Sequence, residues 1–150
     1  MYSKQEASLI RKNFWTSFGQ YMKPLPNADG EFINWLNYKT GIKNIFFRMD
    51  ADIRHTSIAI ELTSADADER LVHYNHFLQL KSILEETVGE QWQWQKDKTD
   101  EHGKVFSSIG IKLNEVNVFN TNDWPAIISF LKPRMIALDQ FWNLVKDSFA

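Results

Sequence analysis

The sequence contains no cysteine, which excludes disulfide bonds, zinc sites with thiolate ligands and cysteine nucleophiles. It also lacks internal repeats and low-complexity tracts, and its four prolines and six glycines are scattered between apolar segments. No apolar run approaches the ~20 residues that a membrane span requires. The first residues lack the apolar core of a signal peptide, so we expect a cytoplasmic protein.

The composition is that of an ordinary globular protein. Hydrophobic residues make up 43% and charged residues 24% of the 150 residues, which predicts one domain over residues 1–150. A chain of this length buries enough surface to fold without a metal or a disulfide. We therefore expect no cofactor.

The net charge of -2 is unevenly distributed along the chain. Residues 1–48 carry seven basic and three acidic side chains, whereas residues 49–102 carry five basic and twelve acidic ones. A surface for nucleic acid is therefore expected in the first third, where cations can meet phosphates. The candidates are Arg11, Lys12, Lys39, Lys43 and Arg48, with Trp35 as a stacking platform unless it belongs to the core.

Capping and breaking residues predict three helices. Ser3 and Glu6 form a capping-box pattern that begins the first helix, and Pro24 ends it. A long second helix is expected from Ser64 to Gly89, because acids follow the cap and glycine suits the end. A third helix begins near Asn122 and keeps its apolar spacing to the end of the chain.

Five segments are rich in β-branched and aromatic residues and are predicted as strands. They cover residues 33–41, 44–51, 56–64, 91–95 and 105–113. The element order is α-β-β-β-α-β-β-α, which predicts an α+β fold. Its mainly antiparallel sheet of about five strands packs against three helices.

The last helix has an unusually regular apolar pattern that allows two interpretations. Its apolar residues are spaced alternately by four and three positions: Trp124, Ile128, Leu131, Met135, Leu138, Trp142, Val145 and Phe149. The simpler interpretation is a helix packed deep against the sheet. The alternative is a coiled-coil-like seam with a second copy or another protein partner.

The chain resembles a bacterial family known as domain of unknown function 4268. The resemblance runs roughly from Phe14 to Phe149, and its most distinctive pieces are Trp94 and the Asp123-Trp124-Pro125 motif. Members often follow a restriction-nuclease-like module, which implies a nucleic-acid or defence setting. These 150 residues carry no such module, and the family offers no catalytic residues to carry over.

Three carboxylates are the candidates for catalysis. Asp50 and Asp52 end one predicted strand and Glu61 lies on the next, so they are expected near one hairpin. Two such acids can hold a magnesium ion while a lysine orients the attacking water. The triplet that begins at Glu61 reads Glu-Leu-Thr and lacks this lysine. Solvated charges are thus the simpler interpretation, and a metal-dependent nuclease is the alternative.

A second candidate site lies on the predicted second helix, where Glu69, His73 and His76 share one stripe. Such residues can bind zinc, but a complete site needs further ligands and supporting hydrogen bonds. The stripe continues through apolar residues, so a packing edge or a partner contact is the simpler interpretation.

The segment QWQWQ at residues 91–95 places Trp92 and Trp94 on one face of a strand. Their glutamine neighbours and the acidic surroundings favour two core residues over a stacking platform. The sequence therefore predicts a binding or assembly domain that is not an enzyme. The alternative is a nucleic-acid-binding or nuclease-like domain.

Overall fold

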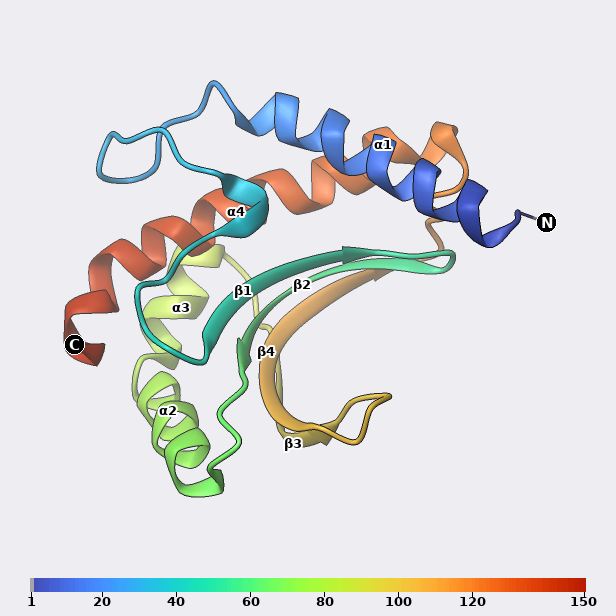
Figure 1. The fold of residues 1–150 in the computed structure, drawn as a ribbon. Coiled ribbons are helices and arrows are strands. Elements are labelled where there is room, and N and C mark those ends of the chain that lie inside the picture. Colours follow the sequence, from blue (N-terminus) through green and yellow to red (C-terminus); the bar gives the residue numbers. More distant parts are fainter. Residues whose placement is uncertain (1) are drawn as a thin grey trace.

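The computed structural model describes residues 2–150 and shows an α+β fold with one antiparallel sheet (Figure 1). Its helices are α1 (Lys4–Met22), α2 (Ala67–Gln79), α3 (Lys81–Val88) and α4 (Trp124–Val145), and its strands are β1 (Ile45–Ala51), β2 (His55–Leu62), β3 (Gln93–Thr99) and β4 (Val105–Asn114). The predicted class is confirmed, but these residues form four strands rather than five and four helices rather than three. No helix among them has the length and apolar character that crossing a membrane requires.

The predicted strand over residues 33–41 is wrong. The Asn34 side chain accepts a hydrogen bond from the backbone N–H of Leu36 and begins a single 3₁₀ turn, Trp35–Asn37. Trp35 is buried, and its Nε1 donates to the carbonyl of Leu25 at 3.0 Å. Aromatic residues in this segment therefore fill the core from a loop, an arrangement that β propensity does not distinguish from a strand.

The single second helix that was predicted is two helices, α2 and α3, which meet at Leu80. Phe77 before the break and Leu84 after it are both buried, so the apolar pattern continues across it. The periodicity alone therefore cannot reveal the change in direction. Gly89 ends α3 in the left-handed conformation, as predicted.

The sheet has the strand order β1-β2-β4-β3, and all neighbouring strands are antiparallel. It bends strongly, and the helices lie outside the bend (Figure 1). Ile60 lies opposite Phe47 on β1 and Ile109 on β4, and these three side chains are buried. The core therefore lies between the convex side of the sheet and the helices.

The last helix belongs to this core. Pro133 lies within α4 without ending it, as the apolar phase predicted. Of the residues proposed for a seam, Leu131, Met135, Leu138, Trp142 and Val145 are buried, and the other three pack partly buried against the core. The pattern that suggested a coiled coil thus serves packing within the chain.

Trp92 and Trp94 also pack as core residues, as predicted. Trp92 is 5% exposed and lies just before β3, and its Nε1 donates to Glu90. Trp94 is half-buried, with its ring edge-on to Tyr74 at 5.8 Å between centroids. Neither indole is open for stacking.

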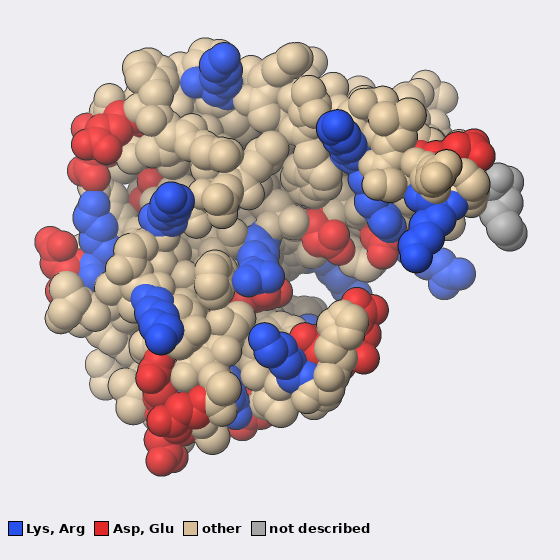
Figure 2. Space-filling model, viewed as in Figure 1, with Lys and Arg blue, Asp and Glu red and all other residues tan. Residues whose placement is uncertain are grey.

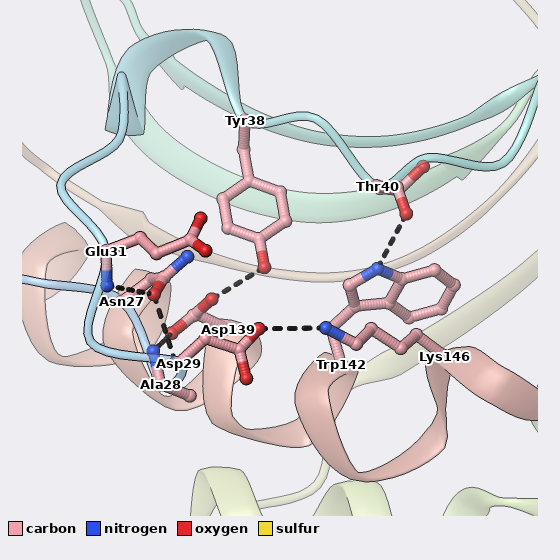
Figure 3. A network of polar contacts seen from close by, with 9 residues as sticks. All are labelled: Asn27, Ala28, Asp29, Glu31, Tyr38, Thr40, Asp139, Trp142 and Lys146. Carbon is pink, nitrogen blue, oxygen red and sulfur yellow. Dashed lines mark hydrogen bonds and ion pairs between the residues drawn. The ribbon is translucent and has the colours of Figure 1, made fainter.

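The long loop between α1 and β1 is held by two side chains of α4 and by Lys146, which directly follows that helix (Figure 3). Asp139 accepts hydrogen bonds from the Tyr38 hydroxyl at 2.6 Å and from the backbone N–H of Ala28 at 2.8 Å. Trp142 donates to the carbonyl of Thr40 at 2.9 Å. Lys146 pairs with Asp29 at 3.0 Å, so the loop is fixed at both of its ends.

Candidate functional site

The concave face of the sheet is the candidate site, because no element among residues 2–150 covers it (Figure 1). Side chains alternate along a strand, so the residues between the core positions all point to this face. They are Phe46, Arg48 and Asp50 on β1, His55, Ser57, Ala59 and Glu61 on β2, Gln93, Gln95 and Lys98 on β3, and Phe106, Ser108, Gly110 and Lys112 on β4. Such an uncovered polar face is available to a ligand.

The floor of this face has almost no side chains. Ala59 and Gly110 lie opposite each other on β2 and β4. A methyl group built on Gly110 would lie 2.7 Å from the Cβ of Ala59 and 2.8 Å from the carbonyl oxygen of Ile58. Only glycine fits there, and the bend leaves a polar hollow of about 270 Å³.

Charges of both signs surround the hollow (Figure 2). Glu61 forms an ion pair with Arg48 at 3.1 Å, and the Arg48 guanidinium lies over the ring of Phe46 at 4.5 Å. Across the sheet, the Lys98 ammonium lies over the ring of Phe106 at 5.5 Å. The face therefore carries two pairs of an aromatic ring and a cation, on opposite sides of Glu61.

Glu61 lies near the end of the central strand β2, between Phe46 on β1 and Ser108 on β4. Burial raises the pKa of this carboxyl, and the nearby Arg48 and Lys98 lower it by less. The group therefore holds its proton more readily than an ordinary glutamate. It can donate a hydrogen bond when protonated and accept one when ionised.

Replacing Glu61 with glutamine is expected to stabilise the fold at neutral pH more than in acid. Because the pKa of Glu61 is raised in the folded protein, the folded state binds more protons than the unfolded state at pH values between the unfolded and the folded pKa. The stability that Glu61 contributes is therefore present in acid and is lost as the pH rises through its folded pKa. Urea unfolding of both proteins from about pH 4 to about pH 8 measures the difference. The exposed carboxylate Glu86, changed to glutamine, is the control, and a difference independent of pH would contradict the expectation.

The three carboxylates proposed for catalysis do not converge. Asp50 on β1 lies opposite Ser57, whereas Glu61 on β2 lies opposite Phe46. Arg48 lies on β1 between Phe46 and Asp50, and thus between the two acids. Asp52 is instead held by Arg11 at 2.8 Å. A hydrogen bond from the backbone N–H of Ile53, and to a smaller extent the pair with Arg11, lower the pKa of this carboxyl. No two of these acids are placed to share a metal ion.

The proposed zinc residues on α2 do not form a metal site. Glu69 accepts a hydrogen bond from Asn44 at 3.3 Å, and His76 stacks on Phe149 with its Nε2 2.9 Å from the hydroxyl of Ser148. Burial lowers the pKa of His73. Residues 2–150 contain no group of three or more such side chains that could hold a metal. Within this stripe, His76 packs against the end of the chain and Glu69 contacts the loop before β1.

The residues proposed for nucleic acid are dispersed over the molecule. Trp35 is buried, and Arg11 is paired with Asp52 and lies over the ring of Phe119. Lys12 is on α1, while Lys39 and Lys43 are on the loop before β1. Of the six candidates, Arg48 alone lies on the concave face. The basic first third therefore does not form one surface.

Sequence reasoning missed the side chains that β3 and β4 contribute to this face. Lys98, Phe106, Ser108 and Lys112 lie there beside the glutamines of QWQWQ. The alternation in VFSSIGIKL already separates a core set from an outward set, so the outward residues were a usable signal. The pairing of β4 with β2 could not be predicted, because the sequence does not show which strands are neighbours.

The family comparison agrees with the resemblance of the sequence. The family described as "Domain of unknown function (DUF4268)" matches residues 10–146. The chain belongs to this family. No curated protein and no solved structure matches it. Family membership assigns no activity, and the nucleic-acid or defence setting that the resemblance implied stays a prediction.

Proposed function

We propose that this chain is a binding domain that is not an enzyme, and that its ligand lies across the concave face of the sheet. The observation that carries the proposal is the uncovered face itself, with its floor reduced to Ala59 and Gly110. Packing alone explains the convex side, where every strand contributes to the core. It does not explain a second face that is hollow and lined by amides, hydroxyls and charges.

The side chains of the face favour single-stranded nucleic acid as the ligand. Bases stack on exposed aromatic rings, and basic side chains beside those rings contact the phosphates. Phe46 with Arg48 and Phe106 with Lys98 supply two such places, and Lys112 adds a third cation. Gln93 and Gln95 offer donors and acceptors to base edges.

The arrangement of the acids supports binding over catalysis. Magnesium-dependent cleavage needs at least two carboxylates on one ion with a positioned water. Asp52 is occupied by Arg11 and Arg48 separates Asp50 from Glu61, so the nuclease alternative loses its metal site. A nucleic-acid ligand also fits the defence setting that the family resemblance implied.

Fluorescence anisotropy with labelled DNA and RNA of about twelve nucleotides tests the proposal. We expect single strands to bind more tightly than duplexes of the same length. Three cations on the face predict an affinity loss of about 20-fold between about 50 and 200 mM salt. Phe46→Ala removes one stacking ring and is expected to weaken binding by about 5-fold or more.

Lysine variants locate the binding surface. Lys98→Gln with Lys112→Gln is expected to reduce the salt dependence by about two thirds, because two of three phosphate contacts are lost. Lys12→Gln with Lys43→Gln is the matched control, since these two exposed lysines lie outside the face. Salt dependence lost only in this control pair would assign binding to another surface. Absence of binding at low salt would reject nucleic acid as the ligand.

A further inference from the structure

A second hollow of about 500 Å³ lies between the α1–β1 loop and the C-terminal half of α4 (Figure 3). Its size is typical of sites for small molecules. Residues 27–41 of the loop form one wall. Asp139, Trp142 and Asn143 on α4 form the other, together with Lys146 just after this helix. It is separate from the concave face, because the two sets of lining residues have no member in common.

This pocket is preformed. Asn27 accepts hydrogen bonds from the backbone N–H groups of Asp29 and Glu31, and Gly30 completes the tight turn in the left-handed conformation. Asp139 and Trp142 on α4, with Lys146 just after it, then fix the loop to this end of the helix. A ligand would therefore meet walls that are already ordered, which reduces the entropy cost of binding.

Several polar groups at the pocket remain free. The side chains of Glu31, Asn37, Lys39 and Asn143 line it, and none has a hydrogen-bond or ion-pair partner among residues 2–150. Two of them are amides that both donate and accept, one is an acceptor and one is a donor. The side chain of Tyr38 points towards Asp139, and its ring supplies an apolar surface in the pocket (Figure 3).

The charges exclude an anion as the preferred ligand. Three carboxylates line the pocket against two lysines, and Lys146 is already paired with Asp29. A phosphate or a carboxylate would thus meet more repulsion than attraction. Hydroxyl groups suit this lining better, because each one donates and accepts and can use both the amides and the carboxylate.

We infer that this pocket binds a sugar ring, whose adjacent hydroxyls bond to Glu31, Asn37 and Asn143 while its C–H face packs on Tyr38. The ring belongs either to a free saccharide or to the ribose of a nucleoside. Both sources present neighbouring hydroxyls on a puckered ring that also carries apolar C–H groups. This site does not depend on the proposed function of the concave face.

Two-dimensional ¹H–¹⁵N NMR of the whole chain tests the inference. The probes are glucose, galactose, N-acetylglucosamine, adenosine and uridine, added separately, with inorganic phosphate as a comparison. We expect a saturable shift of the side-chain amide signals of Asn37 and Asn143, with a dissociation constant in the millimolar range. Shifts with the free sugars indicate a saccharide site, whereas shifts with the nucleosides alone indicate a ribose site.

Matched variants test the location. Asn37→Ala with Asn143→Ala removes two free hydrogen-bonding groups and is expected to weaken binding by about 10-fold. Because these variants lose the two side-chain signals, binding to them is followed by the backbone amide signals of Lys39 and Gly41, which also line the pocket. Asn75→Ala, on the exposed side of α2, is the control and is expected to bind like the wild type. The inference is overturned if no probe shifts these signals, if the double variant binds unchanged, or if phosphate alone produces the same shifts. Oligonucleotide binding is measured separately, so the two sites can fail independently.

Discussion

Replacing Asp139 with alanine is expected to lower the free energy of unfolding by about 3 kcal/mol or more, because two hydrogen bonds to a charged group are lost. Asp139 is 4% exposed and holds Ala28 and Tyr38, which lie on the two sides of the α1–β1 loop. Burial and the neighbouring carboxylate raise the pKa of Tyr38, so its hydroxyl stays protonated and continues to donate. Urea unfolding followed by circular dichroism measures the loss.

Two variants separate the hydrogen bonds from the charge of Asp139. Asparagine at this position can accept from the N–H of Ala28 and donate to the oxygen of Tyr38, so Asp139→Asn is expected to cost less than alanine. Tyr38→Phe removes one of the two bonds, and its effect combined with Asp139→Ala should be less than additive. An Asp139→Ala protein within about 1 kcal/mol of the wild type would show that the carboxylate does not hold the loop.

Replacing Gly110 with alanine is expected to destabilise the protein by about 2 kcal/mol, although alanine is usually tolerated in strands. The added methyl group would lie 2.7 Å from the Cβ of Ala59 and 2.8 Å from the carbonyl oxygen of Ile58. Both atoms belong to the central strand β2, which pairs with β1 and β4 and cannot move away freely. Thermal and urea unfolding measure the change.

A compensating variant shows the source of this strain. Ala59→Gly removes the methyl contact but leaves the contact with the Ile58 carbonyl, so it should restore only part of the stability lost in Gly110→Ala. Ser108→Ala is the control on the same strand and the same face, and it is expected to have little effect. Full stability of Gly110→Ala would mean that β2 and β4 do not approach this closely.

The concave face was only partly predictable. The alternation within β2 and β4 separates the residues of the core side from those of the concave face. The predictions rested only on the core residues. Charge counted along the chain pointed to residues 1–48, yet Lys98 and Lys112 lie outside that segment. Strand pairing, which joins Arg48 to Glu61 and brings β4 beside β2, depends on contacts distant in sequence.

The second hollow could not be predicted, because its two walls lie about a hundred residues apart in the chain. Asp139 falls within a strongly apolar helix and Lys146 directly follows it, and the prediction for this segment rested only on its apolar positions. Only residues 27–30 of this loop were predicted as a loop, and residues 33–41 were predicted as a strand. Only the packing of that loop on α4 gives Asp139 its two hydrogen-bond partners.

The sequence by itself determined the elements whose signals are local. Residues close together in the chain suffice to predict these elements. They are the capping box at Ser3, the left-handed end at Gly89, the alternating strands β1 and β2, and the unbroken α4. Tertiary structure decided the rest, because it sets which surfaces are covered. It buried Trp35 from a loop, divided the second helix at Leu80, and bent the sheet over a Gly–Ala floor to leave the concave face open.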